Sequence, residues 1–483
     1  MTGNVAAIDR GTARRLRRLF GEAISFTRED RICYSFDATD LRFLPEAVAW
    51  PGDAAQVAGA VGIAAESGVP VVARGAGSGY TGGSLPLSGG LVLSFERMNR
   101  VLLVDAKRKV AVVEPGVVND DLRARVEAVG LTYPPDPASL RVSTIGGNVA
   151  ESAGGPRTVL HGTTRDYVAG LEMVTAEGDI ARTGVLSGSR HGWDGGPLFV
   201  GSEGTLAVLT RVALRLTELA ESFATLWAEF PSLGHAASAV AQLTATGLPL
   251  SVLEILDGDT YACAHEYVLG AAPADSAEGA LLIELEGSAR EVTEGVATVS
   301  DLVRSNGATG VREAVGEKER EEIWEIRRSI SPAIARLGEV KINEDIAVPR
   351  SAIPAFVGEM RRISSEAGLP ILAFGHAGDG NLHVNIMLKR AGAGELERAR
   401  RAVSGLFAVA VEMGGALSGE HGIGITKAEH LATELSPVSL DLTARLKGAL
   451  DGRGILNPGK ILADRPNPWW DPPGGNEDGC DRC

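Results

Sequence analysis

Two histidines and a glutamate in the last quarter of the chain have residue types and a spacing that could bind a metal ion. His376 and His383 stand on either side of Gly378–Gly380, a GDG sequence of the kind that joins antiparallel strands. Because side chains alternate along a strand, this hairpin places His376 opposite His383. Glu420 lies in a glycine-rich loop and can supply a carboxylate ligand, which leaves its neighbour His421 free. Imidazole and carboxylate ligands suit zinc, iron or manganese.

The spacing alone leaves simpler interpretations open. Either histidine could cap a turn, and a three-ligand site could also serve a metal hydrolase. Along the second strand of the hairpin, Leu382, Val384 and Ile386 alternate with His383 and Asn385. This alternation predicts that one face of the strand packs into a core while the other carries the polar groups.

The composition is that of a globular protein large enough for two or three domains. The 483 residues are 44% hydrophobic, and the net charge of -15 argues against nucleic acid as a partner. No apolar run reaches the roughly 18 residues of a membrane span, and the N-terminus lacks a signal-peptide core. We therefore expect a cytoplasmic protein, with any membrane association made through a partner. Of the four scattered cysteines, Cys480 and Cys483 fall in an expected flexible tail.

Glycine-rich loops in the first half of the chain predict close backbone contact with a ligand. In RGAGSG, Arg74–Gly79, alternating glycines allow successive N–H groups to converge on an anion, and the arginine adds positive charge. This is not the Rossmann fingerprint, because no helix follows it. Residues 133–136 and 143–155 are expected to be irregular and to line a flat ligand. Before these loops, Asp53 can cap a helix that Gly68 ends. The strands and capped helices around the loops predict a mixed α+β domain.

Beyond residue 218, the expected order of strands and helices, βαββαβ, predicts a ferredoxin-like α+β domain closed by C-terminal helices. A helix over residues 317–337 carries Trp324 and Arg327, and physics alone would leave this arginine in solvent. Lys341, in the next strand, could meet a second substrate carboxylate, although the spacing leaves its register open. The expected limits are 1–35 for an N-terminal helical segment, 36–218 and 219–462 for the two domains, and 463–483 for the tail.

Six motifs in order resemble the FAD-linked oxidase family of the p-cresol methylhydroxylase (PCMH) superfamily. They are RGAGSGYTGG, SxxGG at residues 143–147, GSEGTLAV, HxGDGNLH, SGEHGIG and NPGKI at residues 457–461. The resemblance covers nearly everything from Cys33 to Leu462. Within the family it is greatest to glycolate oxidase D subunits, D-lactate dehydrogenases and D-2-hydroxyglutarate dehydrogenases. It implies a PCMH-type FAD-binding domain followed by a substrate and metal domain.

The resemblance also implies roles for individual residues. The implied metal ligands are His376, His383 and Glu420. The implied catalytic residues are His421 as the base, with Arg327 and Asn385 at the substrate carboxylate. The residues implied to line FAD are Arg74, Gly75, Ala76, Gly77, Ser78, Gly79, Pro135, Asp136, Ser143, Gly146, Gly147, Asn148, Gly154, Glu203, Gly204, Val208 and Asn457. FAD is expected without a covalent link, because Ser78 stands where covalently flavinylated relatives place a histidine.

Together these inferences predict FAD-dependent oxidation of a D-2-hydroxy acid to the 2-oxo acid, with hydride transfer to the flavin and assistance from a divalent metal. D-lactate or glycolate is the expected substrate, and D-2-hydroxyglutarate is the alternative. An iron-sulfur subunit, an electron-transferring flavoprotein, a quinone or a cytochrome is expected to accept the electrons, and a homodimer is left open. A non-catalytic electron-transfer subunit is a competing class, but the retained HxGDGNLH and EHG motifs argue against it. A metal hydrolase would leave the glycine-rich loops without a ligand.

Overall fold

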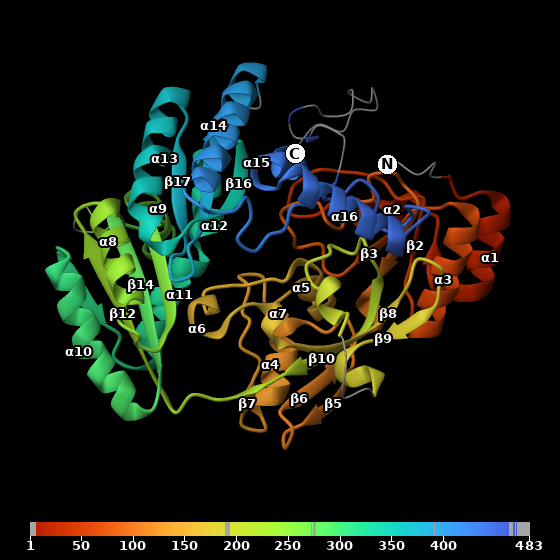
Figure 1. Ribbon diagram of the computed structural model, residues 1–483. Helices are drawn as coiled ribbons and strands as arrows, with labels where there is room; N and C mark the ends of the chain where they lie inside the picture. The colour runs from red at the N-terminus through yellow and green to blue at the C-terminus, as the bar shows by residue number, and fades with distance from the viewer. Residues whose placement is uncertain are drawn as a thin grey trace.

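In the computed structural model of the chain, the expected strands and helices form two α+β domains, which confirms the predicted fold class (Figure 1). The structure describes residues 6–188, 194–271, 273, 277–390, 392–462, 467, 468 and 470. Cys480 and Cys483 lie outside the described residues. Within them, no helix is long and apolar enough to cross a membrane. We retain the domain limits given above as proposals.

The first domain begins with a small four-stranded sheet. Its order is β1-β2-β4-β3, and β4 runs parallel to both β2 and β3. As predicted, Asp53 caps the following helix by accepting a hydrogen bond from the Gln56 N–H, and Gly68 ends that helix at a φ of +68°. These elements are α1 (Arg10–Phe20), β1 (Ile24–Ser25), α2 (Arg28–Cys33), β2 (Ala47–Ala49), α3 (Ala54–Ser67), β3 (Val71–Arg74) and β4 (Leu91–Ser94).

Five antiparallel strands form the second sheet of this domain, in the order β5-β6-β10-β8-β9. Leu122 and Val126 from α4 and Ile145 and Val149 from α5 pack into its core. The elements are β5 (Val101–Asp105), β6 (Val110–Val113), α4 (Asn119–Glu127), β7 (Leu131–Thr132), α5 (Ile145–Glu151), α6 (Thr158–His161), α7 (Thr164–Tyr167), β8 (Val168–Val174), β9 (Ile180–Arg182), β10 (Val208–Arg215) and β11 (Thr217–Glu218).

The helix α5 corrects the expectation that residues 143–155 are irregular. Thr144 caps this helix by accepting from the Gly147 N–H, and Gly146 lies so close to Pro115 that a Cβ at that position would be 2.6 Å from the proline Cβ. Glycine therefore serves helix packing here. The low helix propensity of glycine favoured a loop, but tertiary packing overrides this weak preference.

The second domain is built on a seven-stranded sheet of order β15-β12-β14-β13-β17-β18-β16. The first four strands, numbered along the chain, follow the order 4-1-3-2 with antiparallel neighbours, which is the predicted ferredoxin-like arrangement. An additional helix that we did not expect, α9, connects β13 to β14. These elements are β12 (Ser222–Phe230), α8 (Leu233–Thr244), β13 (Leu250–Asp257), α9 (Gly258–Leu269), β14 (Gly279–Gly287), α10 (Ala289–Ser305) and β15 (Gly310–Glu313).

Helices cover both faces of this sheet. One face packs against α8, α10, α13 and α14, and the other against α9, α11 and α12. Leu382, Val384 and Ile386 point into the first of these cores, as the alternation predicted. The later elements are β16 (Val340–Ala347), α13 (Ile353–Ala367), β17 (Ile371–His376), β18 (Asn381–Leu388), α14 (Ala393–Glu412), α15 (Leu431–Glu434) and α16 (Pro437–Leu450).

The single helix expected over residues 317–337 is broken into α11 (Gly316–Arg328) and α12 (Ile330–Ile334). The break falls at Ser329. Pro332 explains it, because a proline lacks the N–H for the helical ladder and its ring collides with the carbonyl four residues earlier, that of Arg328.

The C-terminal segment returns to the first domain after α16 (Figure 1). Ile455 and Leu456 are buried in the core of the first sheet, and Leu456 forms a parallel bridge with Val71 of β3. The Lys447 ammonium donates to the backbone carbonyls of Thr205 and Leu456. The chain thereby crosses between the two domains twice, which fixes their relative position at the cavity described below.

Glu344, on β16, generates a pH prediction. Burial raises its pKa to about 8, and one of its carboxyl oxygens has no hydrogen-bond partner in the described structure. The folded protein keeps this proton up to about pH 8, whereas the unfolded chain loses it near pH 4.5. Stability therefore falls as pH rises between these values, by at most about 1.4 kcal/mol per pH unit. Glu344→Gln should remove this loss, so its melting temperature should exceed that of the wild type increasingly from pH 5 to pH 8. A constant difference across that range would contradict the prediction.

Candidate active site

The β17–β18 hairpin and the loop after α14 bring the three expected metal ligands together. The Nε2 atoms of His376 and His383 are 3.3 Å apart, and Oε1 of Glu420 is 3.1 and 3.5 Å from them. Nitrogen and oxygen ligands about 2.0–2.1 Å from a tetrahedral zinc lie about 3.3 Å apart, so this geometry fits a divalent ion. The second Glu420 oxygen is buried, and it has no hydrogen-bond partner among the residues that the structure describes. Within the described residues, His376, His383 and Glu420 form a group whose ligand atoms lie close enough together to bind one metal ion. We call it the metal-type cluster.

The hairpin register differs from the prediction. His383 pairs with Phe374, and His376 pairs with Asn381, so the two histidines are diagonal neighbours. They still meet, because residues two apart on a strand share a face. Their rings are 5.0 Å apart and nearly perpendicular.

Glu254, at the centre of β13, is a residue that sequence reasoning missed. Its carboxylate accepts hydrogen bonds from Nδ1 of His376 and from Arg327, the latter at 2.5 Å. Burial opposes its ionisation, yet the charges of Arg327 and His376 lower the pKa of Glu254 to about 2. Such a carboxylate fixes the ring and tautomer of a metal-binding histidine. A lone glutamate within the apolar run LSVLEIL was the available signal.

Asp345, on β16, shapes the loop that carries Glu420 and His421. One of its oxygens accepts the backbone N–H groups of residues 419, 420 and 421 at 2.8, 2.6 and 2.9 Å. The other oxygen is 3.4 Å from Nδ1 of His421 and accepts from the buried Lys427 ammonium. Burial opposes ionisation of Asp345, but His421 and Lys427 hold its pKa well below the usual range. This carboxylate was also missed from the sequence.

Arg327 is buried, with 6% of its surface exposed, so it is not left in solvent as physics alone would have it, and its role at the substrate carboxylate stays a prediction. Its guanidinium stacks over Phe374 at 5.0 Å and uses Nε and Nη2 to bind Glu254. Arg327 lines the cavity described below, and within the described residues its Nη1 forms no hydrogen bond. Asn385 is fully buried, and its side-chain oxygen accepts a hydrogen bond from the Asn343 amide. Asn343 lines the cavity and Asn385 does not, so the predicted contact of Asn385 with a substrate carboxylate stays a prediction.

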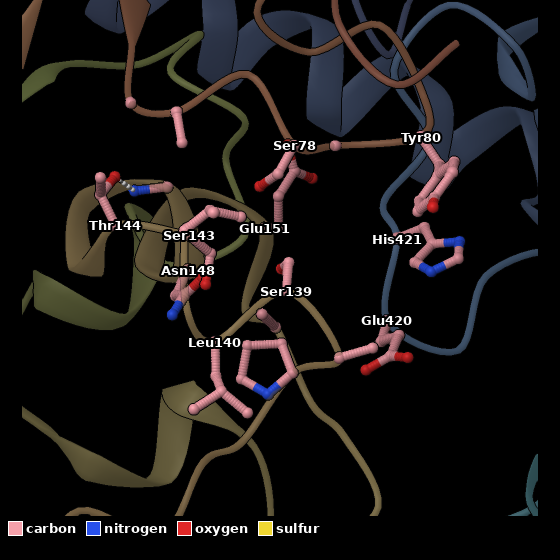
Figure 2. A pocket seen from close by; sticks show the side chains of 18 of the residues that line it. Ser78, Tyr80, Ser139, Leu140, Ser143, Thr144, Asn148, Glu151, Glu420 and His421 are labelled. Atoms are coloured by element: carbon pink, nitrogen blue, oxygen red, sulfur yellow. Dashed lines mark hydrogen bonds between the residues drawn. The ribbon is translucent and has the colours of Figure 1, made fainter. Parts of the chain in front are cut away.

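A cavity of about 910 Å³ lies between the two domains and ends at the histidines. Figure 2 shows Ser143 and Asn148 on one side of it and Tyr80, His421 and Glu420 on the other. The expected FAD-contacting residues that line it are Arg74, Gly75, Ala76, Gly77, Ser78, Gly79, Asp136, Ser143, Gly146, Gly147, Asn148, Glu203 and Gly204.

The other expected residues lie behind this wall. Pro135 accepts a hydrogen bond from Asn119, and Val208 packs in the core of the first domain. Asn457 donates to the carbonyls of Gly83 and Glu203, and so it supports two of the lining loops. Gly154 leaves room for Glu420, whose carboxylate would be 3.0 Å from a Cβ at that position.

The cavity wall fits a large polar cofactor. The RGAGSG loop bends tightly, with Gly77 at a φ of +69°, and a Cβ there would lie 2.1 Å from Nη2 of Arg74. Oγ of Ser143 and Nδ2 of Asn148 are buried polar atoms without a partner in the described structure. Buried polar groups are rarely left unpaired, so these atoms indicate a ligand that binds them.

Comparisons with known proteins agree with this geometry. Residues 45–184 match the FAD binding domain, and residues 219–461 match the C-terminal domain of FAD linked oxidases. The chain is 40% identical over 435 residues to glycolate oxidase subunit GlcD of Bacillus subtilis, covering 90% of this chain and 92% of that one. It is 32% identical over 456 residues to D-lactate dehydrogenase of Anaerostipes hadrus, with 92% and 94% covered.

A solved structure of p-cresol methylhydroxylase with substrate bound shares the fold, with a TM-score of 0.79 at 17% identity over 96% of this chain and 99% of that one. Fold and cavity define a flavoenzyme with a PCMH-type FAD-binding domain. The chain belongs to the FAD-linked oxidase family and is an FAD-dependent oxidoreductase.

The role of Glu254 can be tested through metal affinity. Glu254→Gln keeps the size of the side chain but removes the charge that orients His376, so metal affinity should fall by about 10- to 100-fold. The measurement is a competition titration with a chelator that reports on metal binding. Glu284→Gln is a matched control, since Glu284 is an equally buried glutamate on the adjacent strand that binds Arg157, Arg320 and Trp324 instead. Equal affinities in the two variants would show that Glu254 does not support the metal site.

Proposed function

We propose that this protein oxidises a D-2-hydroxy acid, D-lactate or glycolate, to the 2-oxo acid. The observation that carries the proposal is one cavity that joins a glycine-rich nest to a three-ligand metal-type cluster, His421 and Arg327. The relatives named glycolate oxidase subunit and D-lactate dehydrogenase support it. A non-catalytic subunit would have no need for the complete cluster. A metal hydrolase would leave the unpaired polar atoms of the first domain without a ligand.

The residues divide the chemistry between them. When bound, FAD supplies the hydride acceptor, and a divalent ion on His376, His383 and Glu420 supplies a Lewis acid for the substrate hydroxyl. Arg327 binds the substrate carboxylate through its free Nη1, held in place by Glu254. His421 takes the hydroxyl proton, and Asp345 steadies its ring from the Nδ1 side. The walls of both domains exclude water from this end of the cavity.

The proposal extends to the cofactor link and the electron acceptor. Ser78 lines the cavity and has no side-chain nitrogen for a flavin bond, so FAD is held without a covalent link. Since the relative from Bacillus subtilis is named as a subunit, the electrons pass to an iron-sulfur subunit, an electron-transferring flavoprotein, a quinone or a cytochrome.

Anaerobic mixing with substrate tests the proposal. D-lactate or glycolate should bleach the flavin absorbance of the purified protein, and trichloroacetic acid should release all the yellow colour into the supernatant. His421→Ala should slow the bleaching by about 10²- to 10⁴-fold while FAD and metal stay bound. Glu420→Ala should instead lose metal together with activity. If no 2-hydroxy acid bleaches the wild-type flavin, the proposed function is wrong, and if His421→Ala lacks metal, His421 is a ligand.

A specific observation favours a second candidate substrate, a hydroxy acid with an additional carboxylate such as D-2-hydroxyglutarate. Lys341 is half-buried behind the cavity wall and donates to Oγ of Ser331 at 2.6 Å. Burial lowers its pKa, although Asp40 opposes this, and no carboxylate in the described chain forms an ion pair with it. A partly buried ammonium without a carboxylate partner is stabilised by an anionic ligand.

Lys341→Met tests whether D-2-hydroxyglutarate depends on Lys341 while D-lactate does not. If the second carboxylate binds Lys341, the substitution should lower kcat/KM for D-2-hydroxyglutarate by about 10- to 100-fold and change that for D-lactate by less than about 3-fold. The measurement is steady-state turnover with an artificial dye as the acceptor. Equal losses for both acids would show that Lys341 contacts no substrate carboxylate.

A further inference from the structure

Tyr80 is an aromatic residue of the first domain that borders the proposed reaction centre. It follows the RGAGSG loop and lines the cavity next to His421 (Figure 2). The Tyr80 ring centroid is 5.1 Å from that of His421, with the planes tilted by 33°. His421 in turn stacks on His383 at 5.2 Å with an interplanar angle of 13°. Tyr80 is therefore the outer member of a row of rings that leads to the metal cluster.

The same ring reaches the polar groups of the second domain. Nζ of Lys341 lies 5.9 Å from the Tyr80 centroid. Ser331, which accepts from Lys341, and Asn343 line the cavity together with Tyr80. Within the described part of the chain, the Tyr80 hydroxyl forms no hydrogen bond. Tyr80 thus lines the cavity from the first domain, opposite Ser331 and Asn343 of the second domain. Its hydroxyl is available to a ligand.

The positions of the other groups define which part of a substrate meets this wall. A 2-hydroxy acid has its hydroxyl beside the cluster and His421, and its carboxylate beside Arg327, which stacks on Phe374 rather than on Tyr80. Its C2 hydrogen must face the hydride acceptor. The remaining substituent on C2 is then left for the side of the cavity that Tyr80, Ser331 and Asn343 form.

We propose that Tyr80 is a specificity-determining residue, through which the FAD-binding domain limits the C2 substituent to a short one such as the hydrogen of glycolate or the methyl group of D-lactate. This inference rests on the proposed function and names its substrate class more closely, since it favours glycolate or D-lactate over the D-2-hydroxyglutarate alternative for the wild type. The Tyr80 ring fills the space beside both His421 and Lys341, so it separates a short side chain from the ammonium beyond it. Close packing around a substrate side chain discriminates by about 10- to 200-fold per methylene.

Two substitutions at Tyr80 test the size limit. Tyr80→Leu removes the ring, and Tyr80→Phe keeps it. The measurement is the ratio of kcat/KM for D-2-hydroxyvalerate to that for D-lactate, with flavin absorbance used to confirm that each variant binds FAD. The ratio should rise about 10-fold or more in Tyr80→Leu and stay within about 3-fold of wild type in Tyr80→Phe. An unchanged ratio in Tyr80→Leu would overturn the inference.

A double variant tests whether the ring screens Lys341. Tyr80→Leu should raise the relative kcat/KM for D-2-hydroxyglutarate, and Tyr80→Leu combined with Lys341→Met should lose that gain while it keeps the gain for D-2-hydroxyvalerate. Loss of both gains in the double variant would show that the ring acts through the packing of Lys341 and not on the substrate.

Phe374→Leu is the matched control on the other side of the cavity. It removes the ring that stacks on Arg327, so it should lower kcat/KM for all hydroxy acids by a common factor. A change of preference in this variant equal to that in Tyr80→Leu would contradict the assignment of the side-chain wall. If the wild type oxidises no 2-hydroxy acid, the proposed function fails first. If it does and the Tyr80 ratios match wild type, only the inference about Tyr80 fails.

Discussion

A single buried carboxylate, that of Glu254, joins the two halves of the proposed site. It binds His376 of the metal-type cluster on one side and Arg327 on the other, so the positions that we propose for the metal and for the substrate carboxylate are coupled through one side chain. Isolated charges are costly to bury, and each of these groups offsets the burial of the others. The central strand β13 holds Glu254 rigidly, because it is hydrogen-bonded to strands on both sides.

Asp345 has a comparable role on β16, the edge strand of the same sheet. Three consecutive backbone N–H groups of the SGEHGIG loop converge on one oxygen of this carboxylate. An anion at the centre of such a loop determines its conformation, and with it the directions of Glu420 and His421. The Lys427 ammonium donates to the other oxygen of Asp345 and neutralises its negative charge. The conformation of the SGEHGIG loop therefore depends on a carboxylate of the second domain's sheet and not on the loop sequence alone.

The two domains are held together by a network that also reaches the cavity. Arg157 of the first domain pairs with Glu284 and Glu286 on β14 and with Asp136 on the cavity wall. Burial raises the pKa of Asp136 to about 6 even though Arg157 opposes this. Because Arg157 binds partners in both domains, the wall around the proposed flavin site and the sheet that carries Glu254 cannot shift independently. This coupling is what the role proposed for Tyr80 requires, since the other groups proposed to hold the substrate belong mainly to the second domain.

The sequence by itself determined the α+β class, the capped helix at Asp53, the hairpin around the GDG turn and the three members of the metal-type cluster. These follow from local periodicity, turn chemistry and motifs that the chain carries in contiguous stretches. Only the tertiary structure decided the roles of Glu254, Asp345 and Tyr80. Each comes from a strand or loop far from the groups it contacts, and nothing in its neighbouring residues shows which partner lies across the sheet. The helix at Ile145–Glu151 was likewise decided by packing, because local propensity is weak beside tertiary contacts. The break at Ser329 has a local cause instead, since the ring of Pro332 collides with the carbonyl of Arg328 only four residues earlier, and so the sequence alone contained it.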